Sequence, residues 1–422
     1  MIAARRFGFS SLSLFAGIGA VAIAAVSACT AGTSGDGFEA SSSSAGGAAG
    51  EGGSGTTDPV TTTSTSGFET TTASTGSAGQ PCLSGPNTDL DMDGYTPSQG
   101  DCNDCDANVN PGAIEVVGTE GEGGGGGAGG AGPYVPVDED CDGTADNPPP
   151  ATCDDALTLT SSDAFDAARA IEICKSAADG KWGLVSAQWV RANGTVTAHS
   201  NQYGISPQFG PNVPARQGSN LFVMSSGRAR DASQPEFCGG ISCTGKGAGT
   251  PPPGFPQDVP NCSGDPDIND DVGLEVTLRA PTNATGYKFD FNFYSHEYPE
   301  WVCTSFNDQF IALVTPAPQG SINGNVSFDS QNNPVSVNVA FFDVCPGCPL
   351  GTTELQGTGF ETSAGATSWL QTTAPVEPGQ TFAIRFAIWD TGDTSWDSTV
   401  LIDSFSWIAN AGVEVGTAPV PQ

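Results

Sequence analysis

Residues 81–147 are acidic throughout, and this limits how they can fold. They hold fourteen Asp and Glu residues and no Lys, Arg or His. Two unit charges 4 Å apart repel by about 1 kcal/mol even in bulk water, and by more near protein. A compact fold of this segment therefore calls for a bound cation. The whole chain shares the bias, with 47 Asp plus Glu against 13 Lys plus Arg and a formal charge of -34, which argues against a nucleic-acid partner.

Two short patterns in this segment place aspartates on alternate positions and end in glycine. They read DLDMDG at 89–94 and DEDCDG at 138–143. In EF-hand loops this spacing directs alternate side chains to one Ca²⁺, and the glycine allows the sharp turn. Position 12 counted from Asp89 is Gly100 rather than Glu, and no helix-forming sequence flanks the loop. The segment is therefore not an EF-hand.

The order DxDxDGY, GDCxDxD, NPGAxE and DxDCDG resembles the MopE-type metal-binding motif of bacterial surface proteins. This resemblance implies a small, disulfide-stapled calcium module over residues 81–147, with little regular secondary structure. Oxygen donors favour Ca²⁺ over Zn²⁺ or Cu²⁺. An acidic solvated linker without an ion is the alternative. The candidate ligands that the resemblance assigns are Asp89, Asp91, Asp93, Asp101, Asp104, Asp106, Asp138, Asp140 and Asp142.

The motif is interrupted by a glycine-rich insert at 120–132. This insert and Val117 stand where such motifs often carry a cysteine and a short spacer. The resemblance therefore implies that Cys82 or Cys105 takes over the pairing.

The N-terminus predicts export. Residues 1–28 have the form of a lipoprotein signal peptide, with Arg5 and Arg6 before an apolar run. Val-Ser-Ala-Cys at 26–29 resembles a bacterial lipobox, which implies that Cys29 carries a lipid anchor in the membrane. An ordinary secretory peptide with Cys29 as a spare thiol is the alternative, and both predict export. Residues 29–80, rich in Ser, Thr and Gly, are expected to form a disordered tether, so we expect an outer-membrane or cell-surface lipoprotein.

Cysteine arithmetic agrees with this interpretation. The chain has 13 cysteines, and assigning Cys29 to a lipid leaves 13 − 1 = 12, which can pair fully in an oxidising compartment. Among cysteines that are close in the sequence, the expected disulfide pairs are Cys153 with Cys174, and Cys238 or Cys262 with Cys243. Cys345 and Cys348 are expected to form a structural disulfide rather than a reactive dithiol, because Pro349 and Gly351 leave no room for a following helix.

From residue 151 to about 412 the pattern predicts a mainly β domain, a jelly-roll-like β-sandwich with one short N-terminal helix, followed by a tail at 413–422. Ser162 is expected to cap the helix, which carries apolar residues at helical spacing. Val185, Ala187 and Trp189 alternate before an Asn-Gly turn at 193–194. Further apolar strands are expected at 221–226, 273–281, 287–295, 308–314, 334–342, 381–390 and 399–408.

Three blocks of this domain, at 221–229, 289–314 and 386–405, are together similar to the choice-of-anchor L domain. The middle block contains S-x-EYPE-x-V followed by FND-x-F, and the last contains D-x-G-D followed by WDS. The similarity spans about residues 153–410. It implies a β-sandwich in a secreted, surface-anchored bacterial protein, and we expect such a head to bind a glycan or an extracellular-matrix ligand.

The same blocks carry a second set of carboxylates, namely Glu297, Glu300, Asp308, Asp390, Asp393 and Asp397. If their strands are neighbours, these groups converge on one edge and form a second metal or ligand site. The alternative is that they cap turns. Trp301, Trp389 and Trp396 line a carbohydrate surface or belong to the core. A competing function is a glycosidase-like hydrolase that uses Glu297 and Asp390, although we recognise no catalytic constellation.

Overall fold

The computed structural model describes residues 82, 84–117, 136–147, 153–177, 181–243, 245–339, 341–409 and 412–421. All of them lie within one unit, Thr70–Gln422. The predicted signal peptide, Cys29, the tether at 29–80 and the insert at 120–132 lie outside the described residues. Within the described ranges no helix has the length and apolar character needed to cross a membrane.

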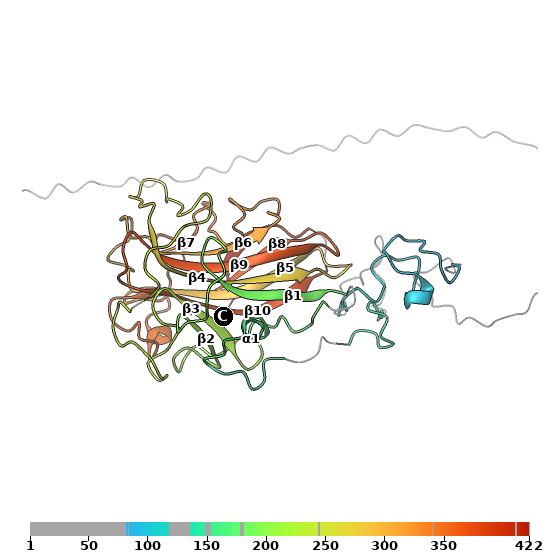
Figure 1. Cartoon of the computed structure of the whole chain (residues 1–422), viewed down its shortest axis with the longest axis horizontal. Helices are drawn as coiled ribbons and strands as arrows, with labels where there is room; N and C mark the ends of the chain where they lie inside the picture. Colours follow the sequence, from blue (N-terminus) through green and yellow to red (C-terminus); the bar gives the residue numbers. More distant parts are fainter. Residues whose placement is uncertain are drawn as a thin grey trace, which may run out of the picture. The chain divides into compact units, whose positions relative to one another are not determined.

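Two antiparallel sheets make up the domain that follows the acidic segment (Figure 1). The five-stranded sheet has the order β1 (Gly183–Val190), β4 (Ile268–Arg279), β9 (Thr381–Thr391), β6 (Gln309–Thr315) and β7 (Val335–Ser336). The six-stranded sheet has the order β11 (Gly416–Pro419), β8 (Gly365–Pro375), β5 (Gly286–Ser295), β10 (Ser398–Ile408), β3 (Leu221–Ser225) and β2 (Tyr203–Ser206). The mainly β sandwich that the sequence predicts is confirmed.

The chain passes repeatedly from one sheet to the other. From β3 to β10, every connection between consecutive strands crosses the sandwich except the one from β6 to β7. This alternation is of the jelly-roll kind, in which both sheets share one core. Because of it, residues next to each other in space come from distant parts of the sequence.

The main core lies between the sheets and is rich in phenylalanine. Phe289 and Phe291 of β5 meet Phe386 of β9 and Phe310 of β6, with ring centroids about 5.1 Å apart across each contact. A second cluster, which includes Phe209, covers the six-stranded sheet with loop residues. β9 and β10 contain apolar runs and β5 alternates aromatic with polar residues, which is why these three strands are visible in the sequence.

Four strands differ from the expectation, and the first is β2, which was not expected. β8 was not expected either, because most of its buried positions are Gly, Ala, Ser or Thr, which make a weak apolar signal. The strand expected at 334–342 shrinks to β7, because the amide of Val339 closes a turn onto Ser336. Residues 413–422, expected to be a tail, include β11, which pairs with β8.

The expected helix is present as α1 (Ala164–Arg169), but its cap is different from the predicted one. Asp163 rather than Ser162 caps it, with a side-chain oxygen 2.9 Å from the amide nitrogen of Phe165. The alternation predicted in β1 is also broken, because a bulge between Leu184 and Ser186 leaves Val185 49% exposed.

Six disulfides pair twelve cysteines. The predicted pairs Cys153–Cys174 and Cys345–Cys348 are present. Of the two partners considered for Cys243, Cys238 is correct, and Cys262 pairs with Cys303 instead. The remaining pairs are Cys82–Cys105 and Cys102–Cys141.

A single 3₁₀ turn, η1 (Pro97–Gln99), is the regular element that the structure assigns to residues 84–117, and η3 (Thr353–Leu355) lies in the sandwich. The acidic module, by which we mean residues 82–147, therefore consists largely of loops in its described part. Its shape is set by disulfides and by hydrogen bonds from backbone amides to carboxylates.

Candidate metal centre

The first DxDxDG loop, residues 89–94, folds around its own carboxylates. Oδ2 of Asp89 accepts a hydrogen bond from the amide of Gly94 at 3.1 Å, and Oδ1 of Asp93 accepts one from Tyr95 at 2.7 Å. Met92 takes a left-handed conformation with φ of 67°, and Gly94 has φ of 94°. These two positive φ angles turn the backbone so that alternate side chains face one side.

The second loop, residues 138–143, repeats this geometry. Oδ2 of Asp138 accepts from the amide of Gly143 at 2.9 Å, and Oδ1 of Asp142 accepts from Thr144 at 2.8 Å. Cys141, in the position that corresponds to Met92, has φ of 55°, and Gly143 has φ of 96°. The repeated sequence pattern therefore produces the same loop twice.

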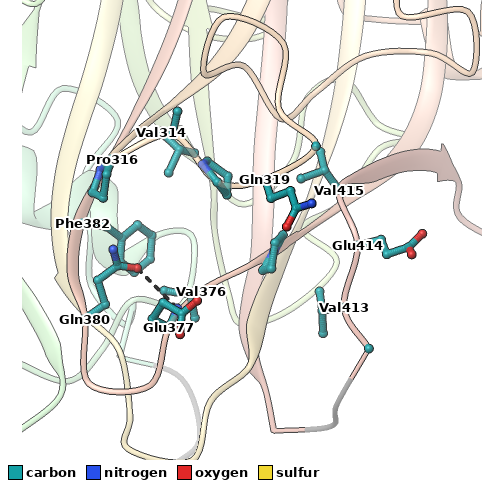
Figure 2. Close-up of a pocket in the computed structure, with 15 residues that line it drawn as sticks. Val314, Pro316, Gln319, Val376, Glu377, Gln380, Phe382, Val413, Glu414 and Val415 are labelled. Carbon is teal, nitrogen blue, oxygen red and sulfur yellow. Dashed lines mark hydrogen bonds between the residues drawn. The ribbon is translucent and has the colours of Figure 1, made fainter.

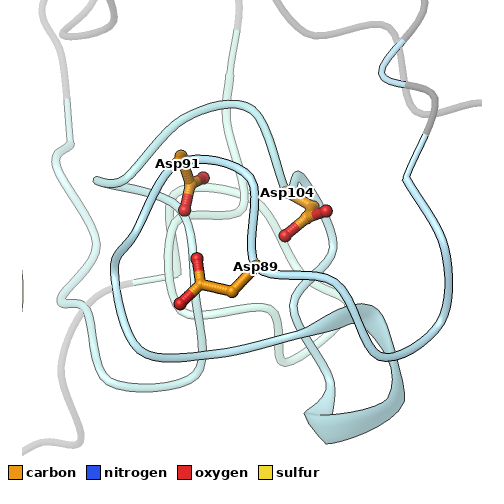
Figure 3. Close-up of side chains that lie close together, drawn as sticks. All are labelled: Asp89, Asp91 and Asp104. Atoms are coloured by element: carbon orange, nitrogen blue, oxygen red, sulfur yellow. The ribbon is translucent and has the colours of Figure 1, made fainter.

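Carboxylates from the first loop and from the following turn converge. Asp89, Asp91 and Asp104 each offer an oxygen within 4.8 Å of the others, and Asp91, Asp93 and Asp101 do the same. Figure 3 shows the first trio with its carboxylates turned toward one another inside the loop. Asp91 belongs to both trios, so it lies at the centre of this group of five.

Several of these oxygens are buried without a partner. Asp101 and Asp104 are only 6% and 3% exposed. Among the described residues, Oδ2 of each finds no hydrogen-bond donor, and the same holds for Oδ2 of Asp91 and Asp93. Buried carboxylate oxygens are costly unless they meet a donor or a cation. These four oxygens are thus suited to a cation.

A second group of carboxylates gathers around the loop at 138–143. Glu115 lies within 4.8 Å of Asp138 and Asp140, and also of Glu139 and Asp146, again counting one oxygen from each. Backbone amides hold the group together, since Asp140 donates to Glu115 at 3.0 Å and Val116 donates to Glu139 at 3.2 Å.

Only some of the predicted ligands belong to these two groups of carboxylates. Neither Asp106 nor Asp142 belongs to a described trio; Asp106 accepts from the amide of Asn108 and Asp142 from that of Thr144. Glu115, Glu139 and Asp146 belong to the described groups although the motif assignment did not include them. The NPGAxE pattern that ends in Glu115 was the available signal, but it gives no spacing to the second loop.

Burial and mutual repulsion raise the pKa values of these carboxyl groups. Burial, followed by the charges of Asp91 and Asp89, raises the pKa of Asp93 to about 6. Burial and then the charge of Asp93 raise the pKa of Asp101 to about 6. In the second group, burial and then Glu115 raise the pKa of Glu139 to about 7. The charged forms need a compensating positive charge, which a cation would supply.

The NPGA segment connects the acidic module to the sandwich. Oδ1 of Asn110 accepts hydrogen bonds from the amide of Gly112 at 2.9 Å and from the hydroxyl of Thr282 at 2.7 Å. Asn283 bonds both backbone groups of Ile114, at 2.9 and 2.8 Å. Thr282 and Asn283 follow β4, so the two carboxylate groups are fixed near a rigid strand end.

The second predicted set of carboxylates lies at one end of the sandwich. Glu297, Asp308, Asp390 and Asp397 are all buried there. Glu300 is exposed, and Asp393 is partly exposed and caps a turn by accepting from the amide of Ser395 at 2.8 Å. The structure thus brings four of the six together and leaves Glu300 apart.

The three tryptophans divide in a similar way. Trp389 is fully buried in a small cluster with Phe255. Trp301 and Trp396 are partly buried and pack edge to face, with ring centroids 5.6 Å apart. Only the latter two are placed to present aromatic surface to a ligand.

A hollow of about 730 Å³ opens where β6 and β8 end and β9 begins. Figure 2 shows its lining, in which Phe382 and Val376 lie near Gln380 and Glu377. The side chain of Gln380 accepts a hydrogen bond from the amide of Glu377 at 3.3 Å. A hollow of this size, lined by both apolar and polar groups, falls in the volume range of ligand sites.

These features define a disulfide-bonded β-sandwich preceded by paired acidic loops. The choice-of-anchor L domain matches residues 179–407, more than half of the 422 residues, and the chain therefore belongs to this family. Choice-of-anchor domains occur in exported surface proteins.

No curated protein matches the chain. Among solved structures, TmCBM61 in complex with beta-1,4-galactotriose matches with 10% sequence identity and a TM-score of 0.23, covering 53% of this chain and 89% of that chain. At this TM-score the likeness supports no inference about the ligand of the present chain.

Proposed function

We propose that this chain is an exported protein of the cell surface that binds Ca²⁺ through the acidic module and presents the sandwich as a binding domain. The observation that carries the proposal is the pair of DxDxDG loops with the same geometry, beside buried carboxylate oxygens that lack donors. Oxygen ligands without thiolate or imidazole suit Ca²⁺. The ion is structural, because the carboxylates lie in loops that are otherwise held by disulfides.

The proposal includes a lipid anchor at Cys29. Its support is the pairing of the other twelve cysteines in six disulfides, which leaves Cys29 as the remaining thiol of the thirteen. A thioether at this position would attach the protein to the outer membrane or cell surface. Mass spectrometry of the N-terminal peptide from membrane fractions tests it, and a free or unprocessed Cys29 would contradict it.

Calcium titration calorimetry on the purified protein tests the metal site. Asp91→Asn removes the carboxylate shared by both trios of the first group, so we expect Ca²⁺ affinity there to fall about tenfold or more, equal to about 1.4 kcal/mol. Asp106→Asn is the matched control, because Asp106 lies in the same segment but outside the described trios. Equal heats for both variants and the unchanged protein would contradict the proposal.

For the binding domain we propose a glycan or matrix ligand at the hollow of Figure 2. Ala317→Trp, at an exposed position in its lining, is expected to reduce binding at least tenfold in a glycan array and a matrix-protein screen, because the larger side chain fills the space. Val196→Trp, which lies on an exposed turn outside the hollow, is the control and should bind normally. Loss of binding in Trp301→Ala but not in Ala317→Trp would move the site to the tryptophan pair.

The hydrolase alternative receives less support from the geometry. Glu297 and Asp390 are 2% and 0% exposed. A glycosidic bond must lie between two accessible carboxyl groups to be cleaved by them. A panel of glycoside and ester substrates, run beside the binding screen, tests this alternative directly.

A further inference from the structure

Four buried carboxylates meet where strands of both sheets end. This strand-end cluster consists of Glu297, Asp308, Asp390 and Asp397. Asp308 directly precedes β6, and Asp390 is the next-to-last residue of β9. Since Gln309 pairs with Trp389, antiparallel register places Asp308 opposite Asp390. Asp397 directly precedes β10, and Glu297 follows β5, its paired neighbour.

Some oxygens of the cluster are satisfied, all by neutral donors. Asp308 accepts from the amide of Thr391 at 3.0 Å and from the hydroxyl of Ser398 at 2.6 Å. Glu297 accepts from the amide of Asp308 at 3.3 Å. These bonds fix the carboxylates in place without neutralising their charge.

Asp390 is different, because it is completely buried and neither carboxylate oxygen has a hydrogen-bond partner of good geometry among the described residues. Oδ1 of Asp397 is in the same condition, while its Oδ2 accepts from the amide of Cys243 at 2.8 Å. Three oxygens in the middle of the cluster are thus without donors. A buried carboxylate in this state is costly unless a proton or a cation accompanies it.

No basic side chain of the described residues forms an ion pair with these four carboxylates, since every ion pair there involves other carboxylates. His296, next to Glu297, stacks on Phe360 with ring centroids 4.2 Å apart, and burial lowers its pKa to about 4, so it is neutral at pH 7. Burial, followed by the charges of Asp308 and Asp397, raises the pKa of Asp390 well above its usual range, which agrees with an uncompensated charge.

We propose that the strand-end cluster binds one Ca²⁺ ion at Asp390, whose two oxygens lack partners. Among the described residues no three carboxylates of this cluster lie within 4.8 Å of one another as those of the acidic module do, so binding would draw Asp308 and Asp397 toward Asp390. All candidate donors are oxygens, and the described cysteines nearby are held in disulfides, which favours a hard cation over Zn²⁺. A small pocket beside the cluster is lined by Asp397 and also by His296, Arg228 and Arg230. This site is separate from the acidic module and does not depend on it.

The ion would tie together strand ends that are far apart in the sequence. A Cβ on Gly227 would lie 1.8 Å from Oδ2 of Asp397, so only glycine lets the loop after β3 approach the cluster this closely. Through Asp397 and Cys243 the ion would also order the segment closed by Cys238–Cys243. The cluster therefore stabilises one whole end of the sandwich.

Metal content per chain tests this proposal. The full protein and its variants are equilibrated with Ca²⁺ at about 10⁻³ M, freed of excess and analysed by plasma mass spectrometry. Asp390→Asn, which keeps the size of the side chain, is expected to lower the content by one ion and to reduce the Tm difference between Ca²⁺ and chelator. Glu300→Gln, at an exposed carboxylate that lies apart from the buried cluster, is the control and should retain both.

A second variant separates this site from the acidic module. The double variant Asp91→Asn and Asp140→Asn changes only the acidic module. One ion per chain should therefore remain, bound at the strand-end cluster. Adding Asp308→Asn should then remove it. Overturning results are an Asp390→Asn protein with unchanged metal content, or a module variant without any remaining ion. Either result would mean that the cluster is neutralised by protons rather than by an ion. The proposed function is tested separately, because it predicts only that the module variant loses the ions of the acidic module.

Discussion

Replacing Phe291 by alanine is expected to destabilise the β-sandwich by about 3–5 kcal/mol. Phe291 is fully buried on β5, between β8 and β10, and its ring lies 5.1 Å from that of Phe310 in the opposite sheet. Removing the ring loses its burial and leaves a cavity between two sheets that cannot close easily. Chemical denaturation followed by tryptophan fluorescence measures the free energy of unfolding.

The control for this prediction is Val185→Ala. Val185 is 49% exposed at the bulge of β1, so its truncation should change stability by no more than about 0.5 kcal/mol. If Phe291→Ala cost no more than this control, the two sheets would not share the packed core that the structure shows.

Removing Ca²⁺ is expected to open the acidic module while β4 stays folded. Without an ion, the carboxylates around Asp91 and around Glu115 repel one another, since no basic residue occurs in residues 81–147. An ion present at 100 times its Kd contributes about 2.7 kcal/mol. Amide hydrogen exchange in residues 84–117 and 136–147 should therefore rise about a hundredfold in chelator.

Acid should partly reverse this opening. The pKa values of Asp93 and Asp101, about 6, and of Glu139, about 7, lie above their ordinary values. The folded module without Ca²⁺ then binds protons more tightly than the unfolded chain does, so its stability falls as pH rises from about 4 to about 7. In chelator, the protection of these amides relative to their intrinsic exchange rate at each pH should therefore rise as the pH is lowered through this window. If the amide exchange rates at neutral pH were the same with and without chelator, both expectations would be contradicted.

The strands of the sandwich were predictable to different degrees. β9 and β10 contain apolar runs, and β5 alternates aromatic with polar residues, so each carries a clear strand pattern in the sequence. β8 is of similar length, but most of its buried positions are small or polar residues, and its place next to β5 depends on a pairing register that sequence periodicity does not encode. The bulge in β1 has the same origin.

In the acidic module, too, some candidate site residues were predictable from local spacing and others were not. The DxDxDG spacing predicted both loops, because the ligand geometry of such a loop depends on a few consecutive residues. Glu115 and Glu139 were not predicted to join the second group, because they reach the second loop through hydrogen bonds between backbone segments that are distant in the sequence. Cys102–Cys141 fixes this approach across 39 residues.

The sequence by itself determined the charge, the loop pattern and the class of fold, because charge density and apolar periodicity are properties of neighbouring residues. An acidic segment without basic residues requires cations wherever it is compact, and alternating apolar runs require sheets. The tertiary structure alone decided which carboxylates share a site. Asp390 faces Asp308 because β9 pairs with β6, whereas Glu300, three residues after Glu297, is exposed. Such convergence depends on strand register and chain crossing, which no local pattern records.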